Sequence, residues 1–141
     1  MSATLLYRIA TVVLVLFAAG HTLGFLRFRP ASAEGRAVFD AMNSVGFDFK
    51  GRKYTYAGFY KGFGLMVTAY LLFAACLAWS LGDLAATQSP AVAVIAWAFT
   101  ATQAACLLLS VLYFFVVPAI FSAVVLVCLG WAAWLVGNVA G

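Results

Sequence analysis

Long uncharged blocks dominate the pattern of hydrophobic and polar positions along this chain. The first block runs for 18 residues between Arg8 and Arg27. The second runs for 21 residues between Lys61 and Asp83, and the 58 residues that follow Asp83 carry no charge. Because about 20 apolar residues in a helix cross the hydrocarbon core of a bilayer, each of the first two blocks predicts one membrane span.

The third block is too long for one span. As a single helix it would run to about 87 Å, against a hydrocarbon core of about 30 Å. Pro90 and Pro118 indicate the starts of two helices, since proline in the first turn removes no helical hydrogen bond. The sequence therefore predicts an all-α fold, an integral membrane four-helix bundle that forms a single transmembrane domain over residues 1–141. Its spans are expected at residues 5–26, 57–81, 91–113 and 118–138.

The first span has a minor alternative interpretation as a cleaved signal peptide. Arg8, the apolar run from Ile9 to Ala19 and the small residue Gly20 imitate the charged, apolar and cleavage regions of such a peptide. We prefer the membrane span.

The connection between the first two spans, residues 27–56, is the only substantial polar segment of the sequence. Ser32 is a favourable helix N-cap, and Glu34 falls in the first turn, where negative charge is stabilising. Apolar residues then recur at helical spacing until Gly46; they are Val38, Met42 and Val45. We expect a short amphipathic helix at the membrane interface. A linker whose basic residues meet lipid phosphates is preferred over a lid that gates a substrate.

The basic residues give the chain an orientation. Most of them fall in or beside this connection: Arg27, Arg29, Arg36, Lys50, Arg52, Lys53 and Lys61. The positive-inside rule places the connection in the cytoplasm and both termini on the opposite side, although Arg8 argues against it. Four tryptophans are expected near the opposite interface, as in an aromatic belt: Trp79, Trp97, Trp131 and Trp134.

The composition supports the membrane class. Hydrophobic residues make up 67% of the chain and charged residues 9%, with a net charge of +4. A soluble domain is typically about one quarter charged, so an ordinary soluble fold is excluded. No nucleic-acid partner is expected, because the few basic residues lie beside spans. The expected partners are membrane lipids and either further copies of the chain or a larger membrane complex.

Several kinds of chemistry lack the residues that they need. Cys76, Cys106 and Cys128 occur singly inside spans, whereas a thiol oxidoreductase needs a paired dithiol. His21 is the single histidine, so we expect no haem held between two histidines, no metal and no other cofactor. No carboxylate lies in the middle of a span, where proton-coupled transporters usually place one.

One polar cluster remains, around His21. This residue lies about 9 Å inside the membrane edge marked by Arg27. Tyr56 and Tyr60 enter the second span from the same side. Glycines four residues apart predict close packing of the two spans at this level. They are Gly20 and Gly24 in the first span, and Gly58 and Gly62 in the second.

The cluster has a catalytic and a structural interpretation. In the first, His21 is a general acid or base that acts with Tyr56 and Tyr60 and faces a pocket open to the cytoplasmic leaflet. The candidate ligand-binding residues are Asp48, Lys61 and Tyr113, together with Gln103, which belongs to a second polar level near the middle of the third span. In the second, slightly favoured interpretation, His21 makes one interhelical hydrogen bond and the tyrosines lie at the membrane interface. For Gln103 a hydrogen bond between helices is also favoured.

Three functions stay open. The preferred one is a module that binds a lipid or another hydrophobic ligand, or an accessory subunit of a membrane complex. The alternative is a membrane enzyme that acts on a lipophilic substrate through His21. A small transporter comes third, since no charged pore residue is available.

Two strings in the first half of the chain resemble known proteins. GHTLGF at residues 20–25 and SVGFDFKGRKYTYAGFYKGFGL at residues 44–65 resemble small bacterial membrane proteins with four spans. This resemblance implies a four-span fold in a bacterial inner membrane. It implies no residue roles.

Overall fold

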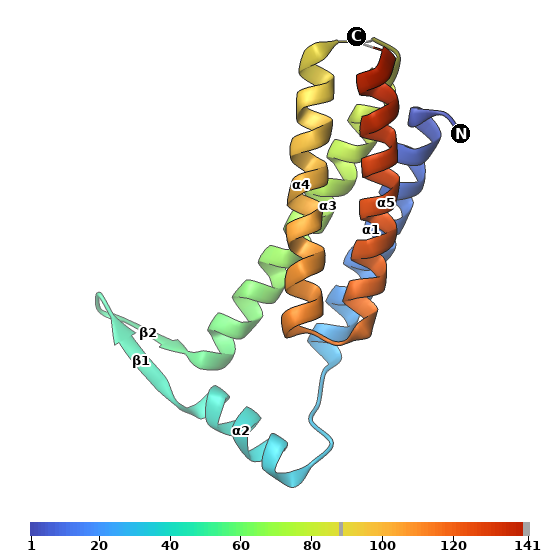
Figure 1. Ribbon diagram of the computed structural model, residues 1–141. Helices are drawn as coiled ribbons and strands as arrows, with labels where there is room; N and C mark the ends of the chain where they lie inside the picture. The colour runs from blue at the N-terminus through green and yellow to red at the C-terminus, as the bar shows by residue number, and fades with distance from the viewer. Residues whose placement is uncertain (88, 140–141) are drawn as a thin grey trace. The chain divides into compact units, whose positions relative to one another are not determined.

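The computed structural model describes residues 1–87 and 89–139. These residues form α-helices, one 3-10 turn and one antiparallel hairpin (Figure 1). In chain order the elements are α1 (Ala3–Arg27), α2 (Ala33–Ser44), β1 (Gly46–Phe49), β2 (Arg52–Thr55), α3 (Tyr56–Leu84), η1 (Ala85–Thr87), α4 (Pro90–Tyr113) and α5 (Val116–Val139).

Four helices, α1, α3, α4 and α5, are long and apolar enough to cross a membrane. The prediction of four such helices is confirmed, and their bounds lie within three residues of the predicted spans. Pro90 opens α4 and Pro118 is the third residue of α5. Both prolines therefore lie where a missing N–H costs no helical hydrogen bond.

The described chain divides into two compact units, and each is described by itself. The first contains residues 1–17 and the chain from residue 71 onward; the second contains residues 18–70. The boundaries fall inside α1 and α3, so both helices contribute to both units.

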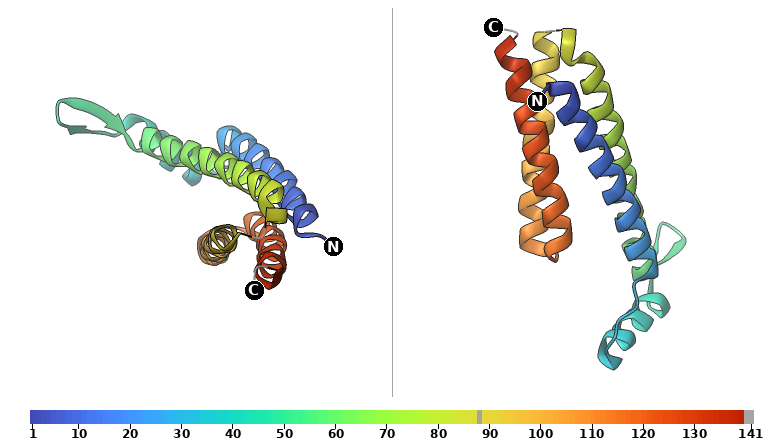
Figure 2. Two further views of the ribbon diagram at one scale, coloured as in Figure 1. Left: turned by 90° about the horizontal axis from the view of Figure 1, so that it is seen from above. Right: turned by 90° about the vertical axis from the view of Figure 1, so that its right-hand side faces the viewer.

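In the first unit, α4 and α5 run side by side in opposite directions (Figure 2). The apolar side chains of Val125 and Leu129 on α5 are buried. The contact of α4 with α5 also contains polar groups, because the Gln103 amide donates to the carbonyl of Ser122 at 3.4 Å. The hydroxyls of Ser122 and Ser110 lie 3.5 Å apart. Such bonds satisfy polar groups that lipid cannot.

The same unit contains a contact between the start of α1 and the end of α3. Tyr7 is fully buried there, and a Cβ added at Gly82 would lie 3.2 Å from the Tyr7 Cβ. Arg8 forms an ion pair with Asp83. Its guanidinium also donates to the Trp79 carbonyl at 3.3 Å and lies 3.3 Å from the centre of the Trp79 ring. Both charged residues at this end of the two helices are therefore partnered.

In the second unit, α2 begins as the sequence predicts. The Ser32 hydroxyl accepts a hydrogen bond from the backbone N–H of Gly35 at 2.9 Å, which confirms the N-cap. The helix ends at Ser44, and Val45 closes it with a backbone bond to Ala41.

The strands β1 and β2 form an antiparallel hairpin, whereas the sequence predicts no strands in this polar connection. Phe47 lies opposite Tyr54 and Asp48 opposite Lys53. Lys50 and Gly51 form the turn with φ values of 49° and 79°, as two-residue hairpin turns of the I′ type require. Stacking of Phe47 on Tyr54, with ring centres 5.9 Å apart, supports this register.

Candidate functional site

His21 makes the interhelical hydrogen bond of the structural interpretation. Its Nε2 lies 3.0 Å from the carbonyl oxygen of Gly64 on α3. A carbonyl only accepts, so Nε2 carries the proton in this contact. The imidazole also stacks on Phe25, with ring centres 5.7 Å apart and planes 9° from parallel. These contacts account for the position of His21 by packing and hydrogen bonding.

Gly64 is also the glycine that permits the close approach of the Phe25 ring to α3. A Cβ at that position would lie 2.5 Å from the Cζ atom of Phe25, closer than real Cβ contacts come. The prediction that Gly20 and Gly24 pack closely against Gly58 and Gly62 is wrong. Among the described residues, Gly20, Gly24 and Gly62 have no heavy atom within 4 Å of such a Cβ, and Gly58 meets only the Thr55 hydroxyl. Close approach depends on which face of a helix meets its neighbour, which glycine spacing alone does not specify.

A second polar contact joins α1 and α3; it uses Thr22, the residue after His21, and Thr68, one turn after Gly64. The hydroxyls of Thr22 and Thr68 lie 2.8 Å apart. Thr22 also donates to the carbonyl of Ala18 at 2.7 Å. Together with His21, these threonines give the helix pair two interhelical hydrogen bonds in the second unit.

The predicted tyrosines do not gather on the imidazole. Tyr60 packs against Phe25, with ring centres 5.5 Å apart, and so contacts the cluster through that ring. Tyr56 packs instead against Phe47 of the hairpin, with ring centres 5.4 Å apart. Tyr113 belongs to the first unit and is 74% exposed.

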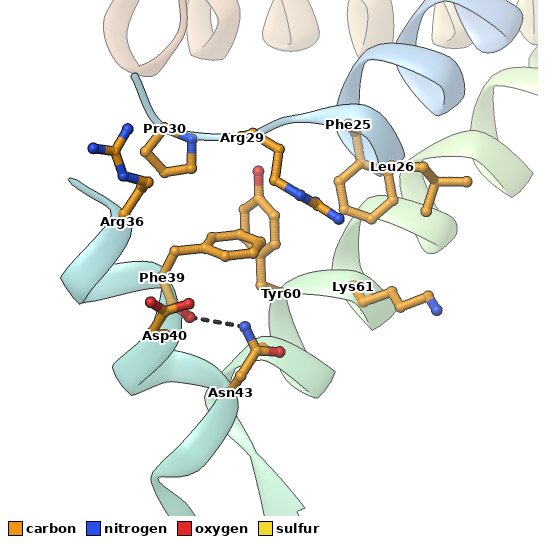
Figure 3. A pocket seen from close by; sticks show the side chains of 11 residues that line it. Phe25, Leu26, Arg29, Pro30, Arg36, Phe39, Asp40, Asn43, Tyr60 and Lys61 are labelled. Carbon is orange, nitrogen blue, oxygen red and sulfur yellow. Dashed lines mark hydrogen bonds between the residues drawn. The ribbon is translucent and has the colours of Figure 1, made fainter. Parts of the chain in front are cut away.

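The remaining predicted ligand-binding residues are dispersed. Asp48 lies in β1, opposite Lys53 in the hairpin register. Gln103 is buried in the contact of α4 with α5. Lys61 lines a cavity in the second unit, although its side chain extends away from Asp40 of α2 (Figure 3).

That cavity lies where the connection after α1, the face of α2 and the first turns of α3 meet, and has a volume of about 510 Å³. Charged, amide and aromatic side chains line it (Figure 3). They include Arg29, Arg36, Phe39, Asp40, Asn43, Tyr60 and Lys61. We call it the polar cavity.

A second cavity of about 360 Å³ shares Pro30, Phe39 and Tyr60 with the first. Its other lining residues carry no charge: Phe28, Gly35, Val38 and Met42. We call it the apolar cavity. The polar and the apolar cavity are thus adjacent, and we call their common residues, Pro30, Phe39 and Tyr60, the shared wall.

The hydrogen bonds in the polar cavity leave several groups available. Arg29 donates to the carbonyl of Phe28 at 2.9 Å, and its guanidinium lies 5.8 Å from the centre of the Phe39 ring. The Asn43 amide nitrogen donates to the carbonyl of Phe39 at 2.8 Å, which leaves the amide oxygen as an acceptor. Arg36 donates to the carbonyl of Ala31 at 2.8 Å. Within residues 1–87 and 89–139, neither Arg29 nor Asp40 forms an ion pair within 4.0 Å.

The sequence pattern indicates Tyr60 and Lys61 only as neighbours of His21. The cavity residues that α2 contributes are not among the predicted site residues. A signal for that side is present in the sequence. Arg36, Phe39, Asp40 and Asn43 are three or four residues apart, so they share one face of a helix. The apolar positions of α2 predict the helix, whereas its polar face contributes to the cavity.

No family model, curated protein or solved structure matches this chain. Among the described residues, no group of three or more His, Cys, Asp or Glu side chains is placed to hold a metal ion.

Proposed function

We propose that this chain is an integral membrane four-helix bundle that binds a lipid, or another hydrophobic ligand with a polar head, at the cavities of α2. The apolar part of the ligand occupies the apolar cavity and its head occupies the polar cavity. The single observation that carries this proposal is the pairing of these two cavities across the shared wall of Pro30, Phe39 and Tyr60. An amphiphile is the class of ligand with matching halves.

The distribution of charge supports the membrane placement in this proposal. Residues 27–61 hold seven of the eight basic residues and three of the four acidic residues of the chain. Apart from Phe25 and Leu26 at the end of α1, all lining residues of both cavities fall in this segment. If α1 and α3 cross the bilayer, these residues lie at its surface, and the positive-inside rule places them in the cytoplasm. Lipid headgroups are the most abundant ligands at that depth.

The α2 helix fits an interfacial position. It has no buried residue, and its apolar positions Val38 and Met42 line the apolar cavity. Its polar positions Asp40 and Asn43 line the polar cavity. An amphipathic helix at a membrane interface places its two faces in this way.

Catalysis by His21 has less support from the geometry. Its Nε2 proton is directed to the Gly64 carbonyl, and Tyr56 packs on the hairpin. His21 lines neither cavity. A general acid or base must reach the reacting group of a substrate, and a proton held by a backbone carbonyl is not placed for that.

Native mass spectrometry of the purified chain with added phospholipids tests the proposal. Phe39→Ala removes part of the shared wall and Arg29→Gln removes one cation of the polar cavity, so both variants should retain fewer lipids than the wild type. Arg52→Gln is the matched control for charge, because Arg52 lies on β2 and lines neither cavity. Equal lipid retention in wild type, Phe39→Ala and Arg29→Gln would refute the proposal.

A further inference from the structure

The polar cavity contains charges of both signs that are not neutralised by each other. Arg29 comes from the connection after α1, and Asp40 comes from α2. Within the described parts of the chain, Arg8 forms an ion pair with Asp83, whereas Arg29 and Asp40 form none with each other. A cavity with a separate cation and anion is complementary to a ligand that carries both charges.

The acceptors of the cavity are grouped on one face of α2. Asp40 and Asn43 are three residues apart, and both line the cavity. The Asn43 amide nitrogen donates one N–H to the Phe39 carbonyl, which orients the amide, and the amide oxygen remains as an acceptor for a ligand. A carboxylate and an amide oxygen side by side accept hydrogen bonds from a donor with several N–H groups.

Three cationic donors line the cavity: Arg29, Arg36 and Lys61. Arg36 donates to the Ala31 carbonyl, and Lys61 extends away from Asp40 (Figure 3), so we assign the phosphate to Arg29. One guanidinium nitrogen is held by the Phe28 carbonyl, which fixes the side chain but leaves further N–H groups free. Guanidinium groups bind phosphate oxygens in pairs of parallel hydrogen bonds. Figure 3 shows Arg29 reaching the cavity from the side opposite to α2, with Phe39 and Tyr60 between Arg29 and the acceptors.

We infer that the ligand head is a phosphate linked to a primary ammonium, as in phosphatidylethanolamine. Arg29 binds the phosphate, while Asp40 and the Asn43 oxygen accept hydrogen bonds from the ammonium. This inference rests on the proposed function and adds the selection of the headgroup. A quaternary choline has no N–H to donate, and a glycerol headgroup has no positive charge for Asp40.

The test compares three lipids with identical acyl chains, bound to the purified chain in detergent. They are phosphatidylethanolamine, phosphatidylcholine and phosphatidylglycerol. Wild type should bind the ethanolamine lipid about tenfold more tightly than either other lipid, the size expected for hydrogen bonds to a charged group. Asp40→Asn should remove this preference. Asp48→Asn is the matched control, since Asp48 is an acidic residue of β1 outside both cavities and should leave the preference unchanged.

Soluble phosphoethanolamine separates the headgroup from the lipid. It should compete only at concentrations far above those of the lipid, because it leaves the apolar cavity empty. Competition at equal concentrations would overturn the assignment of a lipid and leave a small zwitterion as the ligand.

The results distinguish this inference from the proposed function. Equal binding of the three lipids, or the same loss of preference in Asp48→Asn as in Asp40→Asn, would overturn the headgroup inference. If Arg29→Gln and Phe39→Ala still weaken all three lipids in that case, the proposed function stands. If neither variant changes any lipid, both proposals fall.

Discussion

Replacement of Gly64 by alanine is the sharpest test of how α1 and α3 meet. The added Cβ would lie 2.5 Å from the Cε2 and Cζ atoms of Phe25 and 2.8 Å from Cε1. Ordinary contacts begin near 3.4 Å, so the ring must retreat by about 0.9 Å. It cannot do so alone, because it stacks on His21 on one side and contacts Tyr60 on another.

The magnitude follows from comparison with Gly62→Ala. Both substitutions replace a glycine in α3, so the gain of about 1 kcal/mol from the helix propensity of alanine is common to both. Gly62 has no heavy atom of the described chain within 4 Å of an added Cβ. Overpacking typically costs about 1–3 kcal/mol, so Gly64→Ala should be less stable than Gly62→Ala by that amount. Displacement of the His21 hydrogen bond adds about 0.6 kcal/mol, the average for interhelical bonds in membranes.

The assay is unfolding of the purified chain by sodium dodecyl sulfate in mixed micelles, followed by far-ultraviolet circular dichroism. The same pair of variants is then measured with Phe25→Ala, which removes the ring that the Cβ would meet. In that background the difference between the two alanine variants should disappear, as a double-mutant cycle requires of directly coupled residues. Equal stability of the two variants with Phe25 present, or an unchanged difference without it, would refute the reasoning.

Three further predictions concern other parts of the chain. Arg8→Gln should lower the free energy of unfolding by about 1 kcal/mol, and by more than Asp83→Asn does. Arg8 contacts the Asp83 carboxylate, the Trp79 carbonyl and the Trp79 ring, whereas Asp83→Asn removes one exposed ion pair. Equal losses in the same unfolding assay would contradict this assignment. Gln103→Leu should change stability by less than about 1 kcal/mol and leave lipid retention unchanged, because its amide makes one long bond of 3.4 Å between helices; loss of lipid in native mass spectrometry would restore Gln103 as a binding residue. Gly51→Ala should accelerate amide hydrogen exchange across β1 and β2, and Lys50→Asn should slow it. Both positions have positive φ, which alanine tolerates less well than glycine, and asparagine better than lysine. Slower exchange in Gly51→Ala and faster exchange in Lys50→Asn would exclude this turn geometry.

The sequence is most informative where one physical requirement acts over many residues. A span must be apolar for about 20 residues, so the spacing of Arg8, Arg27, Lys61 and Asp83 is enough to locate two helices. The uncharged residues after Asp83 are then divided into two helices that begin near Pro90 and Pro118, because proline is tolerated in the first turn of a helix and not in its interior. The N-cap at Ser32 is equally predictable, because it depends on local backbone geometry alone.

The hairpin has a sequence signal that the prediction of a linker overlooks. Aromatic residues alternate on both sides of Gly51, Phe47 and Phe49 before it and Tyr54 after it, and this alternation around a glycine is typical of two strands joined by a short turn. The many charges of the segment favour the interpretation as a linker. The cross-strand stacking of Phe47 on Tyr54 outweighs that preference.

The sequence by itself therefore determined the four apolar helices, their approximate limits and the place of the charged segment, because hydrophobic length and local capping are properties of short stretches of chain. Only the tertiary structure decided that His21 bonds the carbonyl of Gly64, that Phe25 fills the space of a missing Cβ, and that Arg29 and Asp40 line one cavity. These facts depend on the relative rotation of packed helices, and a small rotation brings different side chains to the contact. Residue spacing places side chains on a face, whereas packing against a neighbour decides which face becomes a site.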